Sequence, residues 1–216
     1  ALDVVPRALD GGCVAPGEVV LTAAGPARAL LTAERTALNL LGRLSGIATL
    51  TRTWVDAVAG TGAAIRDTRK TTPGLRALEK YAVRCGGGVN HRMSLSDAAM
   101  VKDNHVVAAG RITEAFRLVR RAFPDVPVEV EADDVEGAVA AVEAGAGLVL
   151  LDNMPVPELR RAVEAVAGRA QLEASGGLTL ANAAHVAATG VDYLAVGALT
   201  HSAPVLDIGL DLREQR

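Results

Sequence analysis

The chain has 216 residues, of which 50% are hydrophobic and only 2% aromatic, and its formal net charge is −3. A chain of this length buries a sizeable core without a disulfide or a metal staple, and its two cysteines lack paired spacing, which excludes a disulfide scaffold and a zinc finger. The mildly acidic charge argues against a general nucleic-acid binder, and without a long apolar run or a signal peptide we expect a soluble, cytoplasmic protein.

The first 60 residues are expected to be mainly helical. A turn and a short strand are predicted at 14–21, and apolar residues then recur every three or four positions from Pro26 to Ala59. Pro26 fits the start of a helix, and Ser45-Gly46 predicts a break that divides this stretch into two helices.

From residue 61 onward, short apolar strands alternate with helices. Strands are predicted at 63–67, 98–102, 126–131, 148–152, 171–175 and 193–197, with 206–210 as the candidate seventh, and helices at 111–123, 134–144, 155–167 and 179–189. A strand–helix repeat of about 20 to 24 residues indicates parallel βα units. Because neither Gly60-Thr-Gly62 nor Gly145-Ala-Gly147 continues to a third glycine, the pattern favours a βα barrel over an open dinucleotide-binding sheet.

In such a barrel the active groups follow the carboxyl ends of the strands. Here these positions hold Arg69, Lys70, Lys102, Glu131, Asp152, Ser175, Gly176, Gly177 and Gly197. Glu131 and Asp152 lie one repeat apart, so we expect them side by side on adjacent strands. An acid after a strand is also a common helix N-cap, but two acids facing two lysines and an arginine favour a site.

The late strands predict a phosphate pocket. Ser175-Gly176-Gly177 precedes a helix, where glycines let backbone N–H groups approach an anion. A Gly-Gly pair alone is more often just a turn, but its place after a late strand favours the phosphate. Gly197 ends the next strand, and His201 is placed to donate to the same phosphate, although a helix cap or a solvent-exposed position explains His201 equally well. Two carboxylates beside a phosphate suggest Mg²⁺.

Positive charge is concentrated between Arg66 and Arg92. Five arginines and two lysines stand there against Asp67 and Glu79, a local charge of +5. A solvated helix face explains this run, and so does a pocket for a polyanion. Guanidinium groups suit a substrate with carboxylates, because their geometry matches.

Motifs along most of the chain, from about Val14 to Leu212, resemble quinolinate phosphoribosyltransferase. They are the segments 34–39, 44–49, 67–76, 80–92, 102–105, 128–131, 150–153, 173–177 and 196–201. The resemblance implies an α/β fold in which residues 61–216 form an incomplete, seven-stranded parallel βα barrel. Residues 1–60 would be the remnant of an N-terminal α/β sandwich domain with linking helices. The family's N-terminal domain begins several tens of residues earlier, so part of the sandwich is expected to lie outside this sequence.

The resemblance also implies a reaction in NAD biosynthesis. The enzyme would be a pentosyltransferase that converts quinolinate and phosphoribosyl pyrophosphate, with Mg²⁺, into nicotinate mononucleotide, pyrophosphate and CO₂. It would work as a homodimer with a composite active site and without nucleic-acid or membrane partners.

Site residues are carried over by the same resemblance. Quinolinate would be bound by Arg69, His91 and Arg92, together with Arg35 from the partner subunit, and Lys70 would also face the substrate. The 5′-phosphate would be bound by Ser175, Gly176, Gly177, Gly197 and His201. The catalytic residues would be Lys102, Glu131 and Asp152, of which Glu131 and Asp152 would also bind Mg²⁺.

Two other functions remain open at this point. A Schiff-base lyase on a similar barrel would use Lys102 as its amine, but that amine needs desolvation or a neighbouring cation, whereas Asp103 offers the opposite. A truncated paralogue would bind phosphate without catalysis. A close paralogue acting on another pyridine acid is also compatible with the motifs.

Overall fold

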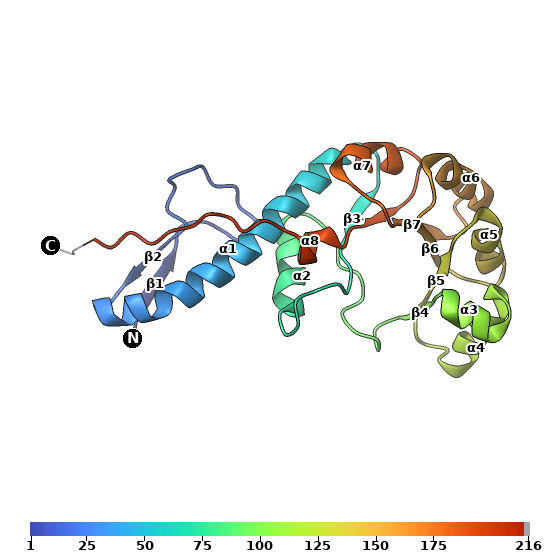
Figure 1. Ribbon diagram of the computed structural model, residues 1–216, viewed down its shortest axis with the longest axis horizontal. Helices are drawn as coiled ribbons and strands as arrows, with labels where there is room; N and C mark the ends of the chain where they lie inside the picture. The colour runs from blue at the N-terminus through green and yellow to red at the C-terminus, as the bar shows by residue number, and fades with distance from the viewer. Residues whose placement is uncertain (214–216) are drawn as a thin grey trace.

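A single 31-residue helix, α1 (Ala27–Ala57), spans the first part of the chain in the computed structural model, which describes residues 1–213 (Figure 1). The predicted break at Ser45-Gly46 is therefore wrong. Gly46 is instead a close-packing position, because a Cβ there would lie 1.9 Å from the carbonyl oxygen of Pro204. The glycine lets the C-terminal segment cross the helix, and it does not end the helix.

The C-terminal segment lies along α1. Leu206 donates its backbone N–H to the carbonyl oxygen of Gly42 on the helix at 3.0 Å, and residues 206–210 are not assigned to a strand. The candidate seventh strand is wrong, because this extended stretch bonds to a helix instead of a sheet edge.

A two-stranded antiparallel ribbon precedes α1. It consists of β1 (Asp3–Pro6) and β2 (Leu21–Ala24). The strand predicted at 14–21 thus begins only at its last residue, and β1 is not predicted. The ribbon lies beside the first turns of α1, at the end of the molecule away from the other strands (Figure 1).

The rest of the chain forms a six-stranded, all-parallel sheet. Its strands are β3 (Ala64–Arg66), β4 (Ala99–Val101), β5 (Val128–Ala132), β6 (Leu148–Asp152), β7 (Gln171–Ser175) and β8 (Tyr193–Ala195). The order is β3-β8-β7-β6-β5-β4, so all six predicted strands are confirmed. The edge strands β3 and β4 do not pair with each other in residues 1–213, and Val89 forms an isolated bridge with Arg66 beside β3. The fold is therefore the expected incomplete barrel, with six strands in place of seven.

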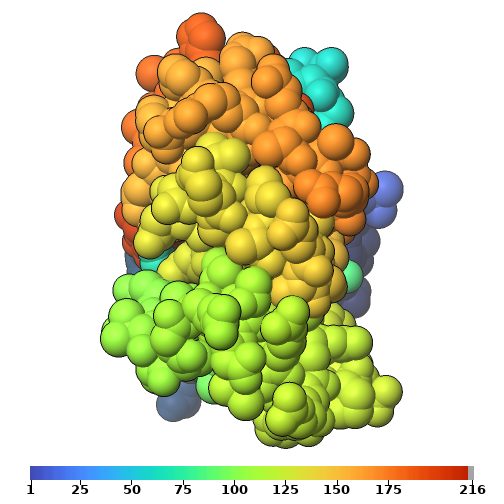
Figure 2. Space-filling view, turned by 90° about the vertical axis from the view of Figure 1, so that its right-hand side faces the viewer, coloured from blue at the N-terminus to red at the C-terminus, as the bar shows by residue number. Residues whose placement is uncertain are grey.

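Helices cover the outer face of this sheet. The helices after α1 are α2 (Arg76–Cys85), α3 (Asp103–Ala109), α4 (Ile112–Ala122), α5 (Val135–Glu143), α6 (Val156–Val166), α7 (Leu180–Ala187) and the short α8 (Ala198–His201). Of these, α4 to α7 form the outer layer, α3 packs on α4, and α2 and α8 pack on α1 (Figure 1). The four predicted helices are confirmed as α4 to α7, and α2, α3 and α8 are additional. Figure 2 shows the outer layer running in chain order from green through yellow to orange. None of the helices in residues 1–213 combines the length and the apolar composition that a membrane crossing requires.

The two faces of the sheet differ in polarity because side chains alternate along each strand. Outward-facing positions are apolar and buried under the helices: Ile65, Val101, Val130, Val149, Leu151, Leu172, Ala174 and Leu194. The concave face of the same strands carries Arg66, Glu129, Glu131, Asp152 and Glu173. The core therefore lies between sheet and helices, and the charged concave face is available for chemistry.

Candidate active site

The carboxyl ends of the strands bring three predicted catalytic residues to one edge of the concave face. Glu131 ends β5 in register with Leu150, and Asp152 lies two residues further along β6, so both acids share a face on adjacent strands as the repeat predicts. Lys102 follows β4 and its Nζ contacts Oε2 of Glu131. The site therefore contains two carboxylates, one of which is paired with the ammonium group of Lys102.

Arg69 and Arg92 come together from two segments that are far apart in the sequence. Arg69 follows β3, and Arg92 lies in the irregular stretch before β4. Burial, and then the positive charge of Arg69, lower the pKa of the Arg92 guanidinium, so the two cations are close enough to repel. Nε of Arg69 is buried without a hydrogen-bond partner in residues 1–213. Two half-buried like charges of this kind favour a ligand with negative charge.

A buried carboxylate binds the loop that carries Arg69. Glu79, on α2, accepts hydrogen bonds from the backbone N–H of Thr72 at 3.0 Å and from its hydroxyl at 2.8 Å. Arg43, on α1, pairs with the same carboxylate at 2.9 Å. The loop after β3 is thus tied to two helices, which holds Arg69 in place.

His91 is buried, and both of its ring nitrogens are occupied by protein groups. Nδ1 accepts the backbone N–H of Arg92 at 2.7 Å, so Nε2 is the protonated nitrogen and donates to Glu129 at 2.7 Å. In this arrangement the ring orients Arg92 and has no free donor. The role expected for His91, direct contact with a carboxylate of quinolinate, would need one of these bonds to open.

Three charged residues of the concave face were not among the predicted site residues. Arg66 donates to Glu173 at 2.6 Å, and Glu173 lies 3.7 Å from Nε2 of His91. Burial, and then the charge of Glu129, raise the pKa of Glu173 to about 7. Alternation along the strands was the available signal, since Glu129 must share the face of Glu131 and Glu173 that of Ser175.

The atoms of His91, Glu129 and Glu173 lie within 4.8 Å of one another, a spacing that also suits a metal ion. However, the His91–Glu129 hydrogen bond and the Arg66–Glu173 ion pair already account for most of this group. We therefore interpret it as a buried hydrogen-bond network.

Two glycine-containing loops from neighbouring strands lie at the other end of the site. Ser175 ends β7 in register with Ala195 of β8, and Gly176 has a φ of +85°. A Cβ on Gly197 would lie 3.2 Å from both Lys70 Cδ and His201 Nε2. The structure thus brings together the predicted phosphate residues, Ser175, Gly176, Gly177, Gly197 and His201, and adds Lys70 to them. A cavity of about 210 Å³ lies beside this group, lined in part by Ser175, Gly176 and Gly177.

Arg35 is not part of this arrangement within one chain. It lies on α1, its side chain is 76% exposed, and the nearest carboxylate, Glu34, is 4.0 Å away. Its guanidinium group is therefore largely exposed to solvent in the single chain.

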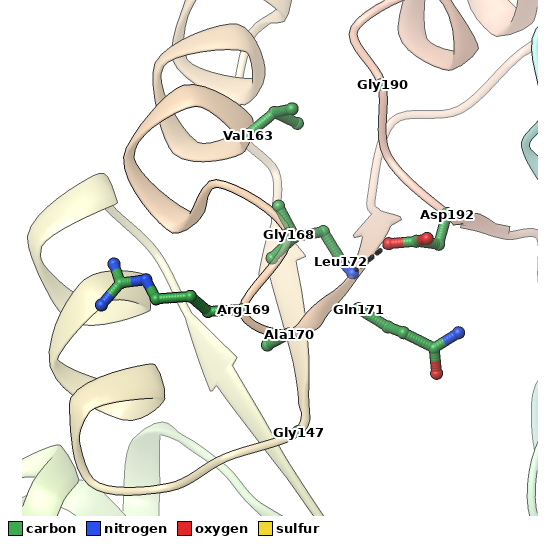
Figure 3. Close-up of a pocket in the computed structure, with 9 residues that line it drawn as sticks. All are labelled: Gly147, Val163, Gly168, Arg169, Ala170, Gln171, Leu172, Gly190 and Asp192. Atoms are coloured by element: carbon green, nitrogen blue, oxygen red, sulfur yellow. Dashed lines mark hydrogen bonds between the residues drawn. The ribbon is translucent and has the colours of Figure 1, made fainter.

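A second cavity, of about 360 Å³, lies at the opposite, amino edge of the sheet (Figure 3). Gly147, Gly168 and Gly190 line its rim. Asp192 is fixed there by accepting the backbone N–H of Leu172 at 2.7 Å (Figure 3). None of the predicted site residues lines this cavity, so it is separate from the strand-end site.

The comparisons with known proteins agree with this geometry. A family model described as the C-terminal domain of quinolinate phosphoribosyl transferase matches residues 47–211, and the model of the N-terminal domain matches residues 1–45. The carboxylating nicotinate-nucleotide pyrophosphorylase of Mycobacterium leprae is 58% identical over 212 residues, which are 97% of this chain and 75% of the relative. The human protein of the same name is 44% identical, over 94% of this chain and 70% of its own length.

Solved structures give the same result. NadC from Streptococcus pyogenes superposes with a TM-score of 0.92 at 42% identity, over 95% of this chain and 73% of that one. The nicotinate-nucleotide pyrophosphorylase of Ehrlichia chaffeensis superposes with a TM-score of 0.93 at 38% identity, over 97% and 77%. The chain therefore belongs to the quinolinate phosphoribosyl transferase family.

Proposed function

We propose that the reaction of the family takes place on the charged concave face, with each group of side chains serving one part of the two substrates. The chain is a pentosyltransferase of NAD biosynthesis, which makes nicotinate mononucleotide, pyrophosphate and CO₂ from quinolinate and phosphoribosyl pyrophosphate. The observation that carries the assignment of roles is the arginine pair: Arg69, whose buried Nε has no hydrogen-bond partner in residues 1–213, and Arg92, whose backbone N–H is held by His91 and whose Nη1 is held by Ala98.

Quinolinate has two carboxylates on adjacent ring carbons. Arg69 and Arg92 supply two cations from separate segments, and their mutual repulsion is relieved when a dianion binds between them. A monocarboxylate neutralises only one of the two, so the pair favours the dicarboxylate.

The phosphoribosyl group occupies the other end of the site. Backbone N–H groups at Gly176, Gly177 and Gly197 face the 5′-phosphate, and Lys70 and His201 add side-chain donors. Thr200 Oγ1 donates to the carbonyl oxygen of Lys70 at 2.7 Å, which links the loop after β3 to the turn after β8.

The chemistry is electrostatic. As pyrophosphate leaves, positive charge develops on the ribosyl carbon C1′, and the carboxylates of Glu131 and Asp152 stabilise it. The pyridine nitrogen attacks C1′, and Lys102 offsets the negative charge of the leaving pyrophosphate. The bond between ring carbon C2 and its carboxylate then breaks, because the cationic ring accepts the electron pair, and C2 takes up a proton as CO₂ departs.

The donors at this edge fit Mg²⁺. Two carboxylates at neighbouring strand ends are the number that Mg²⁺ takes from a protein when phosphate oxygens and water complete its shell. Glu131 and Asp152 would hold the ion, which when bound supplies positive charge to the pyrophosphate.

A homodimer would complete the site. Arg35 is exposed and distant from the other site residues, and the N-terminal part also exposes the apolar side chains of Val4, Val5, Leu31 and Leu40. Such exposed apolar surface supports contact with a second copy, whose barrel would receive Arg35. The free cysteines Cys13 and Cys85 support a reducing, cytoplasmic location.

The Schiff-base alternative receives no support. It requires a desolvated, uncharged lysine amine. Lys102 instead contacts the Glu131 carboxylate, and its side chain is 45% exposed.

A product assay tests the proposal. Quinolinate labelled in the carboxylate on C2, with phosphoribosyl pyrophosphate and Mg²⁺, is expected to give nicotinate mononucleotide and labelled CO₂ in equal amounts, while nicotinate gives no nucleotide. Comparable turnover of nicotinate, or nucleotide formed without release of label, would contradict the proposed use of the arginine pair.

A further inference from the structure

A fully buried ion pair, between Asp67 and Lys80, lies beside the segments that carry Arg69 and Arg92. Asp67, directly after β3, is 0% exposed, and Lys80, on α2, is 1% exposed, with Nζ in contact with Oδ1 of the aspartate. Burial lowers the pKa of Lys80 despite this partner, so the ammonium is held there at a desolvation cost. A buried ion pair is seldom more stabilising than apolar side chains of the same volume, so its presence points to a role other than stability.

The ion pair holds the backbone of one residue of the site. Asp67 Oδ1 accepts the N–H of His91 at 2.7 Å, and Lys80 Nζ donates to the carbonyl oxygen of His91 at 2.9 Å. Asn90 adds to this by donating to Asp67 Oδ2 at 2.6 Å and to the carbonyl oxygen of Lys80 at 2.9 Å. His91 lies outside any strand, so these side chains replace the partners that a sheet would give its backbone.

The same ion pair connects the two segments that carry the guanidinium groups. Asp67 is two residues before Arg69, and His91 is followed directly by Arg92. The ring of His91 adds a second attachment, because Nδ1 accepts the N–H of Arg92 at 2.7 Å. The two segments are also joined by the Val89 bridge to β3 and by Arg76, which donates to the carbonyl oxygens of Arg69 at 3.3 Å and Met93 at 3.1 Å. The ion pair adds the attachment that fixes both backbone groups of His91, directly before Arg92.

We propose that Asp67 and Lys80 are positioning residues that set the distance between Arg69 and Arg92, and so match the site to two adjacent carboxylates. Neither residue contacts the substrate in this account. The inference rests on the proposed function, because it assigns the spacing of the arginine pair to the dicarboxylate.

The main test uses the double variant Asp67→Asn/Lys80→Met. Removal of one partner alone would leave a buried, unpaired charge, whereas the double variant keeps the volume and is neutral. The introduced asparagine would still accept the N–H of His91, but the introduced methionine cannot donate to the carbonyl oxygen of His91. We expect the KM for quinolinate to rise by about tenfold or more, while the KM for phosphoribosyl pyrophosphate changes less than about twofold.

A selectivity measurement separates positioning from a general loss of structure. Phthalate has adjacent carboxylates and isophthalate has carboxylates one carbon further apart, so the wild type should be inhibited more strongly by phthalate. The double variant should lose most of this preference. An unchanged ratio of the two inhibition constants would overturn the inference.

The control variant is Val166→Ala, which truncates a fully buried side chain on α6, outside the site. This variant should lower thermal stability and leave both the KM for quinolinate and the phthalate preference unchanged. If it changed these two quantities as much as the double variant does, the effect of the ion pair would be explained by stability alone. Asn90→Ala, which leaves the ion pair intact, should raise the KM for quinolinate by a smaller factor, and it provides the test if the double variant does not fold. A wild-type enzyme that does not use quinolinate would refute the proposed function itself.

Discussion

Replacement of Arg92 by alanine tests the arginine pair directly. Arg92 is half-buried in the irregular segment before β4, and its Nη1 donates to the carbonyl oxygen of Ala98 at 2.6 Å. Burial, and then the charge of Arg69, lower the pKa of Arg92. Alanine removes one of the two cations and leaves the rest of the pocket in place.

The expected cost follows from the surroundings of this side chain. Loss of one member of a buried, hydrogen-bonded charge pair costs about 2 to 5 kcal/mol. Arg92 is only half-buried, and its removal also relieves the repulsion with Arg69 in the free enzyme, so the lower part of this range applies. About 3 kcal/mol corresponds to a loss of roughly 150-fold in kcat/KM for quinolinate.

Initial rates with quinolinate varied at saturating phosphoribosyl pyrophosphate measure this loss, and the KM for the second substrate should change less than about twofold. The matched control is Arg161→Ala, because Arg161 lies on the outer helix α6 with a side chain that is 61% exposed, and it should behave as wild type. A value of kcat/KM for Arg92→Ala within about threefold of wild type would refute the reasoning.

Three further predictions concern other parts of the site. Gly176→Ala should raise the KM for phosphoribosyl pyrophosphate by about tenfold or more, since φ is +85° and a Cβ would lie 2.1 Å from a side-chain oxygen; an unchanged KM contradicts the phosphate assignment. Burial and the charge of Glu129 raise the pKa of Glu173 to about 7, so the folded state keeps a proton that the unfolded chain releases, and stability falls between about pH 4.5 and pH 7. Between pH 5 and pH 8 the wild type should therefore lose about 3 kcal/mol of unfolding free energy that the variant Glu173→Gln keeps, and urea unfolding at the two pH values measures this difference. Equal pH dependence in both proteins would argue against this explanation. A reassociated equal mixture of Arg35→Ala and Arg69→Ala should regain about a quarter of wild-type activity, because half of the dimers then have one intact site; no recovery counts against the composite site.

The barrel strands could be predicted because each is a short apolar run in a regular repeat. The outward residues of β5 to β7 are Val, Leu and Ala, and their burial depends only on the neighbouring helices. Strand ends in a parallel sheet share one edge, so the sequence also placed Lys102, Glu131 and Asp152 near one another. Local pattern and topology were sufficient for these residues.

Contacts between distant segments could not be predicted in this way. Gly46 has the composition of a helix break, and only its approach to Pro204 explains why the helix continues. Residues 206–210 alternate like a strand, and only the bond from Leu206 to Gly42 shows that they lie on a helix. In both places the outcome depends on a partner about 160 residues away, which local propensity does not contain.

Buried charged residues were the second feature that could not be predicted from the sequence. The run from Arg66 to Arg92 left a solvated helix face and an anion pocket open, and the structure divides it between several environments. Lys80 is inside the protein, while Arg69 and Arg92 are half-buried, on the segments after β3 and before β4. A buried lysine or glutamate is not expected from sequence unless its partner is known, which is why Glu173 was missed.

The open side of the barrel and the arginine pair are one feature of the fold. An ionic concave face cannot close into the apolar interior that fills an ordinary barrel, so its charges must be paired or face a ligand. The gap between β3 and β4 is taken by the segment that begins at Gly86, where a Cβ would lie 2.4 Å from the carbonyl oxygen of Ala48 on α1. This segment makes a single bridge, from Val89 to β3, and then leaves the sheet with His91 and Arg92. A regular seventh strand here would use its backbone groups in the ladder, and Arg92 would alternate with its neighbours across the sheet. Because the segment stays irregular, Asp67 and Lys80 can hold its backbone at His91, directly before the second arginine.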